Sequence, residues 1–189
     1  MTGPLTELES TALAVVAQSG PCTTYALRKA FARSVTAQWS ASAGTLYPVI
    51  ARLNRLKFVT AQRRADDGRG SQVLAATAAG RARVASWVMA LGPAEADSVP
   101  DPVRTRLHFL ELLPPSRRAH FLKQALKLTD AAIVRTRAFL AEERANSEFD
   151  YLASLGGLYQ LQARRKWLSE LTAALRRRSI SNTARGLRR

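Results

Sequence analysis

The chain has 189 residues, enough for one or two domains with a buried core, and its formal net charge of +15 favours a polyanionic partner, nucleic acid before an anionic membrane. Its single cysteine excludes an intramolecular disulfide and a cysteine-based metal site. No apolar run approaches the roughly 18 residues of a membrane span and no signal-peptide pattern opens the chain, so we expect a cytoplasmic protein with no membrane partner.

The basic charge is concentrated at the two ends of the chain. Residues 1–91 hold eleven basic and four acidic residues, residues 92–175 hold twelve and ten, and residues 176–189 hold six and none. We therefore predict a basic N-terminal domain over 1–91, a Gly/Pro-containing linker over 92–100 and a helical domain over 101–176. The remainder, 177–189, is predicted to be a disordered basic tail that either adds nonspecific DNA affinity or only aids solubility.

Two helices are predicted before residue 34. Thr6 and Glu9 have the spacing of a capping box, so the first helix should begin at Thr6. The second spans about 24–33 and turns Arg28 and Lys29 outward from its apolar face. Such a basic face is often only solvated, but its place directly before the next segment favours contact with DNA phosphates.

The third helix carries the most informative motif, Gly44-Thr45-Leu46-Tyr47-Pro48. Its apolar back is predicted from helical spacing to comprise Leu46, Val49, Ile50 and Leu53. The opposite face would comprise Gly44, Thr45, Tyr47, Pro48, Arg52 and Arg55. A thin polar face with an apolar back suits a helix that enters the major groove, with Pro48 in the second turn.

A β-hairpin is predicted after this helix. Its strands span 58–63 and 71–76, and its polar, Gly-rich tip is flanked or occupied by Arg63, Arg64 and Arg69. These arginines suit phosphates or an adjacent minor groove, although two aspartates at the tip oppose that charge. Such a hairpin is marginal alone and must pack on the preceding helices.

Helices are predicted for most of the remaining chain. Thr77 should cap a fourth helix with an apolar stripe of Val84, Trp87, Val88 and Leu91, and Asp101-Pro102 should begin another that ends at Pro114-Pro115. Long helices then span about 116–145 and 148–176. Apolar residues recur every seven positions on both: Leu126, Ile133 and Leu140, then Leu161, Leu168 and Leu175. The two helices either pack on each other or, as we expect, form a homodimer interface.

In this order the motif, the hairpin and the exit Thr77-Ala78-Ala79-Gly80-Arg81 resemble the PadR-type transcriptional regulators over roughly residues 6–91. The resemblance implies a mainly α fold with a small β-hairpin wing: an N-terminal winged helix-turn-helix and a C-terminal long-helix dimerisation region. It also implies a homodimeric repressor that responds to a small molecule. The aromatic residues proposed to line a pocket for such an effector are Trp87, Tyr151, Tyr159 and Trp167. Lys57 departs from the family pattern, which has glycine after the recognition helix.

The sequence predicts a division of labour on double-stranded DNA. Phosphates would be held by Arg28, Lys29, Arg52 and Arg55, whereas base edges would meet Ser42, Thr45 and Tyr47. The Tyr47 ring has an equally weighted alternative, which is to pack against Phe31 or Phe58. The competing function is a winged-helix protein-interaction module with only nonspecific affinity for nucleic acid.

An enzyme is not predicted. The two histidines, His108 and His120, are not at metal-ligand spacing, and no cysteine or acidic cluster joins them. Glu142-Glu143 lies among arginines on a helix, as expected of a solvated ion-pair face. We therefore expect no catalytic residues, no metal and no cofactor.

Overall fold

The computed structural model describes residues 3–33, 43–63, 72–96, 100–145 and 147–186 of the chain. The chain divides into two compact units, Met1–Ser98 and Val99–Arg189. Their boundary lies inside the segment 92–100 that the sequence marks as a linker. A short helix, α5 (Pro93–Ala96), occupies part of that segment.

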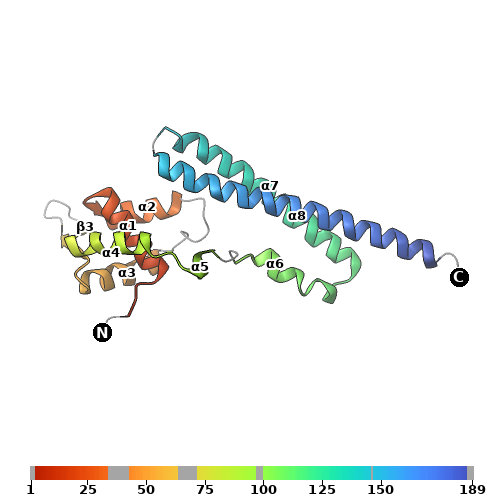
Figure 1. The fold of residues 1–189 in the computed structure, drawn as a ribbon, viewed down its shortest axis with the longest axis horizontal. Helices are drawn as coiled ribbons and strands as arrows, with labels where there is room; N and C mark the ends of the chain where they lie inside the picture. The colour runs from red at the N-terminus through yellow and green to blue at the C-terminus, as the bar shows by residue number, and fades with distance from the viewer. Residues whose placement is uncertain (1–2, 34–42, 64–71, 97–99, 146, 187–189) are drawn as a thin grey trace. The chain divides into compact units, whose positions relative to one another are not determined.

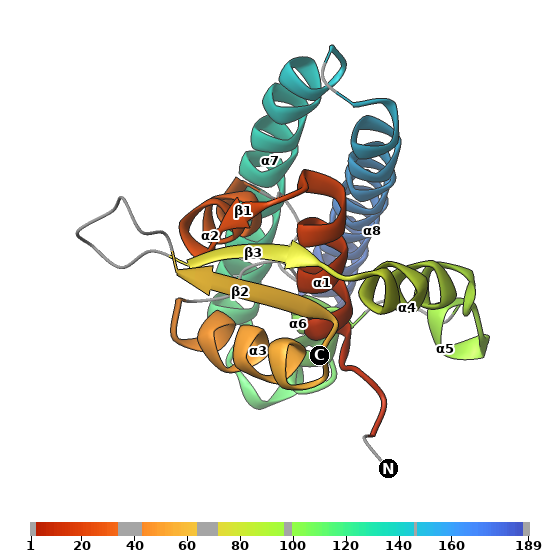
Figure 2. The ribbon, with the colours of Figure 1, turned by 90° about the vertical axis from the view of Figure 1, so that its left-hand side faces the viewer.

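The first unit is a helical domain with a small antiparallel sheet. Its elements are α1 (Glu7–Ser19), β1 (Cys22–Thr23), α2 (Thr24–Arg33), α3 (Ala43–Arg55), β2 (Val59–Arg63), β3 (Gln72–Ala76) and α4 (Ala78–Met89) (Figure 1). Figure 2 shows β3 between β1 and β2, and both pairings are antiparallel. The sequence did not predict β1, because two residues are too few to show the alternation typical of a strand.

One hydrophobic core holds α1, α2, α3 and the sheet together. The largest side chains at its centre are at most 2% exposed: Leu13, Val16, Leu27, Phe31, Leu46, Leu53, Val59 and Leu74. Burial of each such side chain contributes about 1.5–3 kcal/mol before the cost of ordering the chain is subtracted. The apolar back predicted for the third helix is therefore confirmed as the side that fixes α3 to the rest of the unit.

The end of α3 is a Schellman motif built without glycine. The Phe58 amide donates to the Leu53 carbonyl at 3.0 Å, and the Lys57 amide donates to the Asn54 carbonyl at 2.9 Å. This pattern requires a left-handed residue directly after the helix, and Lys57 takes that conformation with φ +59°. The missing glycine has therefore not changed the turn, but Lys57 bears the strain of a Cβ in left-handed backbone.

The beginning of α4 clamps the same turn. Thr77 caps α4, since its Oγ1 accepts a hydrogen bond from the Gly80 amide at 3.0 Å, as predicted. The Thr77 hydroxyl lies 2.8 Å from the Lys57 carbonyl oxygen, to which it donates, and the Thr77 amide donates to the Phe58 carbonyl at 3.0 Å. A Cβ on Gly80 would lie 2.1 Å from the Phe58 carbonyl oxygen, so the close approach of α4 requires glycine there.

The second unit is a pair of long antiparallel helices with a short helical segment before them. It comprises α6 (Pro102–Leu107), the 3-10 turn η2 (Leu110–Leu112), α7 (Pro115–Glu143) and α8 (Glu148–Gly186). Figure 1 shows α7 and α8 side by side. Asp101 caps α6 as predicted, and its second carboxylate oxygen accepts a hydrogen bond from Arg164 of α8 at 2.8 Å.

The apolar residues that recur every seven positions form a seam along each long helix, and these seams pack α7 against α8 within one chain. Ile133 and Leu140 are buried in one cluster with Leu158, and Leu168 is buried in another with Leu122. The other three seam residues, Leu126, Leu161 and Leu175, are partly buried against the same clusters. The intrachain alternative therefore accounts for the repeat, because two helices of comparable length cover each other's seam.

Three helix ends differ from the sequence prediction. The helix after Asp101 stops at Leu107, and the carbonyls of the following turn are bonded by Arg118, whose Nε donates to Leu113 at 2.6 Å. The fourth helix ends at Met89, so Leu91 lies beyond it and is exposed with Val88. The last helix continues to Gly186 through most of the predicted disordered tail, because extending an established helix costs little per residue.

Within the described ranges, no helix is long and apolar enough to cross a lipid bilayer.

Candidate nucleic-acid interface

The two faces of α3 have opposite chemistry. Leu46, Val49, Ile50 and Leu53 are buried, whereas Thr45, Tyr47, Pro48 and Arg55 are exposed. Pro48 lies inside the helix in its second turn, as predicted. The exposed face is narrow and carries small or short side chains between Tyr47 and Arg55, which is what a helix needs to enter a groove about 12 Å wide.

Tyr47 lies on the surface and not in the core. Its side chain is 62% exposed, while Phe31 belongs to the buried cluster and Phe58 is partly buried against it. Packing against either phenylalanine, the alternative weighed for this ring, would have buried it. The phenol instead borders a groove between α3 and α2.

The outer face of α2 is basic and aromatic. Arg28 and Lys29 are exposed, while Leu27 and Phe31 bury the opposite side. Tyr25, one turn before Arg28, is 65% exposed. The guanidinium carbon of Arg28 lies 5.3 Å from the centre of the Tyr25 ring, within cation–π range.

Arg52 has a different role from the one predicted. Its Nη1 donates to both carboxylate oxygens of Glu9 in α1 at 2.6 Å. Its Nη2 lies 3.4 Å from the Gly3 carbonyl oxygen and 3.5 Å from that of Pro4. Because these bonds occupy the guanidinium inside the unit, Arg52 positions α3 against α1, and we remove it from the set proposed to bind phosphates.

Glu9 connects two elements. It completes the predicted capping box, accepting from the Thr6 amide at 2.8 Å, and it accepts from Arg52. Burial by itself raises the pKa of Glu9, but the bond from the Thr6 amide and the bond and charge of Arg52 outweigh it, so the pKa lies below its usual value of 4.5. Glu9 is therefore ionised at neutral pH and ties the start of α1 to α3.

Several predicted DNA contacts lie outside the described residues. These are Ser42, which precedes α3 in the sequence, and Arg64 and Arg69, which lie between β2 and β3 in the sequence. The backbone of Arg63 ends β2, opposite Gln72, but its side chain is outside the description. The site as described therefore consists of α2 and α3, with the strands of the wing beside them.

The aromatic residues proposed for an effector pocket do not converge in the second unit. Tyr151 packs with the Ile133 cluster and Trp167 with the Leu122 cluster, while Tyr159 is 60% exposed. Successive members of this set are eight residues apart on α8, which separates them by about 12 Å along a straight helix. Trp87 belongs to the first unit, where its Nε1 donates to Glu7 at 3.3 Å.

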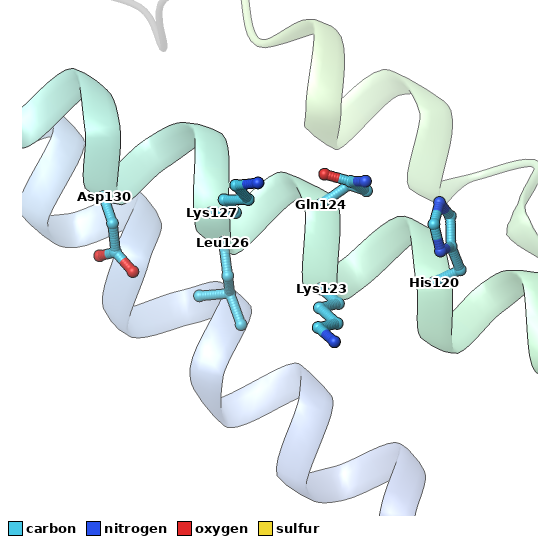
Figure 3. Close-up of a pocket in the computed structure, with 6 residues that line it drawn as sticks. All are labelled: His120, Lys123, Gln124, Leu126, Lys127 and Asp130. Carbon is cyan, nitrogen blue, oxygen red and sulfur yellow. The ribbon is translucent and has the colours of Figure 1, made fainter.

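An open hollow lies along α7. It has a volume of about 570 Å³ and, as Figure 3 shows, all of its side chains project from this one helix: His120, Lys123, Gln124, Leu126, Lys127 and Asp130. Asp130 is paired with Arg165 of α8 at 2.6 Å. A ligand site usually encloses most of its ligand and converges polar groups from several elements, and this hollow does neither. In the part of the chain that the structure describes, no group of three metal-ligating side chains occurs.

Tyr25 and Ala51 are the site residues that sequence reasoning missed. Ala51 is exposed on α3, between Pro48 and Arg55 on helical spacing. Tyr25 precedes Arg28 by three residues, the spacing that places two side chains on the same face of a helix. That spacing was visible in the sequence, but a single aromatic residue there gave no reason to prefer an exposed position over a buried one.

A small three-stranded antiparallel sheet, together with a helix α3 that is buried on one side and exposes a narrow face on the other, defines a winged helix-turn-helix protein. The model of the "Transcriptional regulator PadR-like family" matches residues 12–86. No curated protein sequence matches the chain significantly. The family match over residues 12–86 lies within the first unit and includes the motifs at 44–48 and 77–81. The members of that family are transcriptional regulators and not enzymes.

Solved structures share the fold over almost the whole chain. Bacillus subtilis PadR in complex with operator DNA is 18% identical, with a TM-score of 0.77, and the match covers 91% of this chain and 99% of that one. The same protein in complex with p-coumaric acid is 17% identical, with a TM-score of 0.71 and coverage of 93% and 98%. The Vibrio cholerae virulence activator AphA is 20% identical, with a TM-score of 0.71 and coverage of 90% and 98%.

Proposed function

We propose that this protein is a PadR-like transcriptional regulator that binds a pseudo-palindromic operator as a homodimer in the cytoplasm and represses transcription there. The observation that carries the proposal is the exposed face of α3, with Thr45, Tyr47 and Arg55 outward while four apolar residues brace it from behind. Thr45 and Tyr47 would meet base edges, and Arg28, Lys29 and Arg55 would hold phosphates. The DNA-bound structure of Bacillus subtilis PadR, which has the same fold, supports double-stranded DNA as the partner.

The dimer surface needs apolar side chains that the helix pair leaves uncovered. On α8, Phe149, Leu152, Gly156 and Tyr159 recur at helical spacing and are all exposed, with Phe149 at 82%. Among the described residues, none lies within 4 Å of a Cβ built on Gly156, apart from its chain neighbours and the backbone of its own helix, which leaves room for a close neighbour. On α7, Val134 is exposed in the same way. We propose that these surfaces, and not the buried seams, pair two subunits, because contiguous exposed apolar residues mark association sites.

Selection of bound fragments from random DNA tests the proposal. A dimer with twofold symmetry should enrich inverted half-sites whose centres are about 34 Å, one helical turn, or a multiple apart. Footprints of the selected sites should show the same symmetry. If binding is blind to sequence and disappears near physiological salt, the protein-interaction module is the correct reading instead.

The sign of regulation needs its own experiment. A dimer seated on an operator that overlaps a promoter blocks access to that promoter, so a reporter downstream of a selected operator should fall when the protein is expressed. A rise in that reporter would contradict repression, and one protein of this fold is described as an activator.

We also propose that a small aromatic molecule acts as effector, which the p-coumaric acid complex of Bacillus subtilis PadR supports. An effector shifts DNA affinity only if it binds the DNA-competent and incompetent states unequally. p-Coumaric acid serves as the probe: it should raise the midpoint of thermal unfolding and release a selected operator. No change in either quantity at millimolar concentration would count against an aromatic effector of this type.

A further inference from the structure

A groove between α2 and α3 brings two exposed tyrosines and one arginine together. It has a volume of about 160 Å³ and is lined by Thr24, Tyr25, Arg28, Leu46 and Tyr47. Only Leu46 among these is a core residue; both tyrosine rings are more than 60% exposed. The packing of the first unit does not account for two large aromatic rings that are exposed to solvent next to a cation.

The Tyr25 ring restricts the Arg28 guanidinium without using its hydrogen bonds. The contact is with the face of the ring, at 5.3 Å from its centre. A guanidinium presents its five N–H donors in its own plane, so one that lies over a ring still offers its edge to a phosphate. Lys29, the next residue on the same helix, offers a matched comparison, because it makes no such ring contact with any residue that the structure describes.

The geometry of α2 keeps this pair on the outer surface. Tyr25 and Arg28 are three residues apart and therefore share one side of the helix. Leu27 and Phe31 are buried on the other side, each 1% exposed, and prevent α2 from rotating the pair inward. The groove is thus held from beneath by the core and bordered on its α3 side by Tyr47.

We propose that Tyr25 is a positioning residue for DNA binding: it holds the Arg28 guanidinium in place so that the groove takes one phosphate of the DNA backbone. This inference rests on the proposed function and adds a residue to it. Its effect is entropic, since an arginine that is ordered beforehand loses less side-chain freedom on binding. Immobilising one such side chain costs about 0.5–1.5 kcal/mol, which corresponds to roughly a two- to tenfold change in affinity.

The test measures operator affinity at several salt concentrations for wild type, Tyr25→Leu, Tyr25→Phe, Arg28→Ala and Tyr25→Leu/Arg28→Ala. Tyr25→Leu should weaken binding roughly two- to tenfold and leave the salt slope unchanged, because Arg28 still neutralises its phosphate. Tyr25→Phe keeps the ring and should bind like wild type. Arg28→Ala should reduce the slope of log K against log salt by about 0.9. In the Arg28→Ala background, Tyr25→Leu should have no further effect.

Three results would overturn the inference. Tyr25→Leu that binds like wild type would show that the ring does not matter. Tyr25→Phe as weak as Tyr25→Leu would assign the role to the phenol oxygen as a direct contact. Additive losses in the double variant would show that Tyr25 acts independently of Arg28. Unchanged thermal unfolding of each variant shows that the fold is intact; a variant that fails to fold is replaced by Tyr25→Met.

Failure of the inference is distinguishable from failure of the proposed function. If wild-type protein selects no DNA sequence, the proposed function is wrong whatever the variants do. If wild type binds its selected operator and only the Tyr25 and Arg28 comparisons fail, the function stands and the positioning role does not.

Discussion

Lys57 occupies a backbone conformation that suits glycine. Its φ is +59°, and the hydrogen bonds around it fix that conformation. Left-handed backbone costs a residue with a Cβ about 1–2 kcal/mol, while glycine loses part of that advantage through its greater freedom in the unfolded chain. We predict that Lys57→Gly raises the free energy of unfolding by about 0.5–1 kcal/mol in urea denaturation. Lys57→Ala keeps the Cβ and is the control; an equal gain from it would show that strain is not the cause.

Gly80 is constrained in a different way from Lys57. At Lys57 a Cβ is unfavourable because of the backbone φ, whereas at Gly80 a Cβ would collide with a neighbouring atom. Its Cβ would meet the Phe58 carbonyl oxygen at 2.1 Å. We predict that Gly80→Ala lowers the free energy of unfolding by about 1–3 kcal/mol, because α4 must move away from the turn after α3. The adjacent exposed residue offers a control: Ala79→Gly should cost no more than about 1 kcal/mol, the difference in helix propensity. A Gly80→Ala protein as stable as wild type would contradict the close approach.

Features determined by nearby residues were predictable at this scale, whereas features with distant partners were not. The caps at Thr6, Thr77 and Asp101 follow from side chains two or three residues from the amides that they bond. Arg52 was misassigned, because its partner Glu9 is 43 residues away in the sequence and an arginine on the outer half of a helix looks the same whether it binds phosphate or carboxylate.

Between elements, the Glu9–Arg52 pair ties α1 to the recognition helix. Removing the charge with Glu9→Gln leaves the Arg52 guanidinium without its carboxylate, and we predict a loss of about 1–3 kcal/mol at pH 7. The folded-state pKa of Glu9 is below its usual value of 4.5, so its stabilisation is present in full above about that pH and is lost as the pH falls through the folded-state value.

Urea denaturation of wild type and Glu9→Gln from pH 7 to pH 3 measures this difference. The stability gap between the two proteins should shrink as the pH falls below about 4.5, because wild-type Glu9 becomes neutral there as glutamine already is. Arg52→Gln should remove part of the same pH dependence. A gap that stays constant over this range would mean that the pair contributes nothing through the charge of Glu9.

The ends of elements were less predictable than their existence. In the first unit, α2 and both strands of the wing lie within a residue of the predicted bounds, and α1 and α4 begin at the predicted caps. The seven-residue seams were found too, but periodicity alone does not say which helix covers them. Ile133 on α7 and Leu168 on α8 are each buried by the other helix of the same chain, a partner that depends on how the two helices pair.

At the scale of the whole molecule, the long helices carry two kinds of apolar residue, those buried within the unit and those exposed to solvent. Leu168 is fully buried within the unit, whereas Phe149 on the same helix is exposed. We predict that Leu168→Ala costs about 2–5 kcal/mol of stability through the cavity that it leaves. Phe149→Asp should leave the unfolding of the subunit little changed but shift the protein from dimer to monomer and weaken operator binding.

Analytical ultracentrifugation over a range of concentrations distinguishes the two effects. A Phe149→Asp protein that sediments as wild type does would remove the exposed stripe of α8 from the dimer surface. The exposed polar residue Ser169, farther along α8 and off the helical spacing of this stripe, provides the control, since Ser169→Asp adds the same charge outside it.

The central claim is that the exposed face of α3 reads bases while α2 only holds the backbone. Selection from random DNA by wild type, Thr45→Val and Lys29→Ala, with the salt dependence of each, tests it most directly. We predict that Thr45→Val changes the selected sequence and keeps the salt slope, whereas Lys29→Ala keeps the sequence, weakens all sites alike and lowers the slope by about 0.9. Both variants selecting the wild-type sequence, each with only a uniform loss of affinity, would contradict the account.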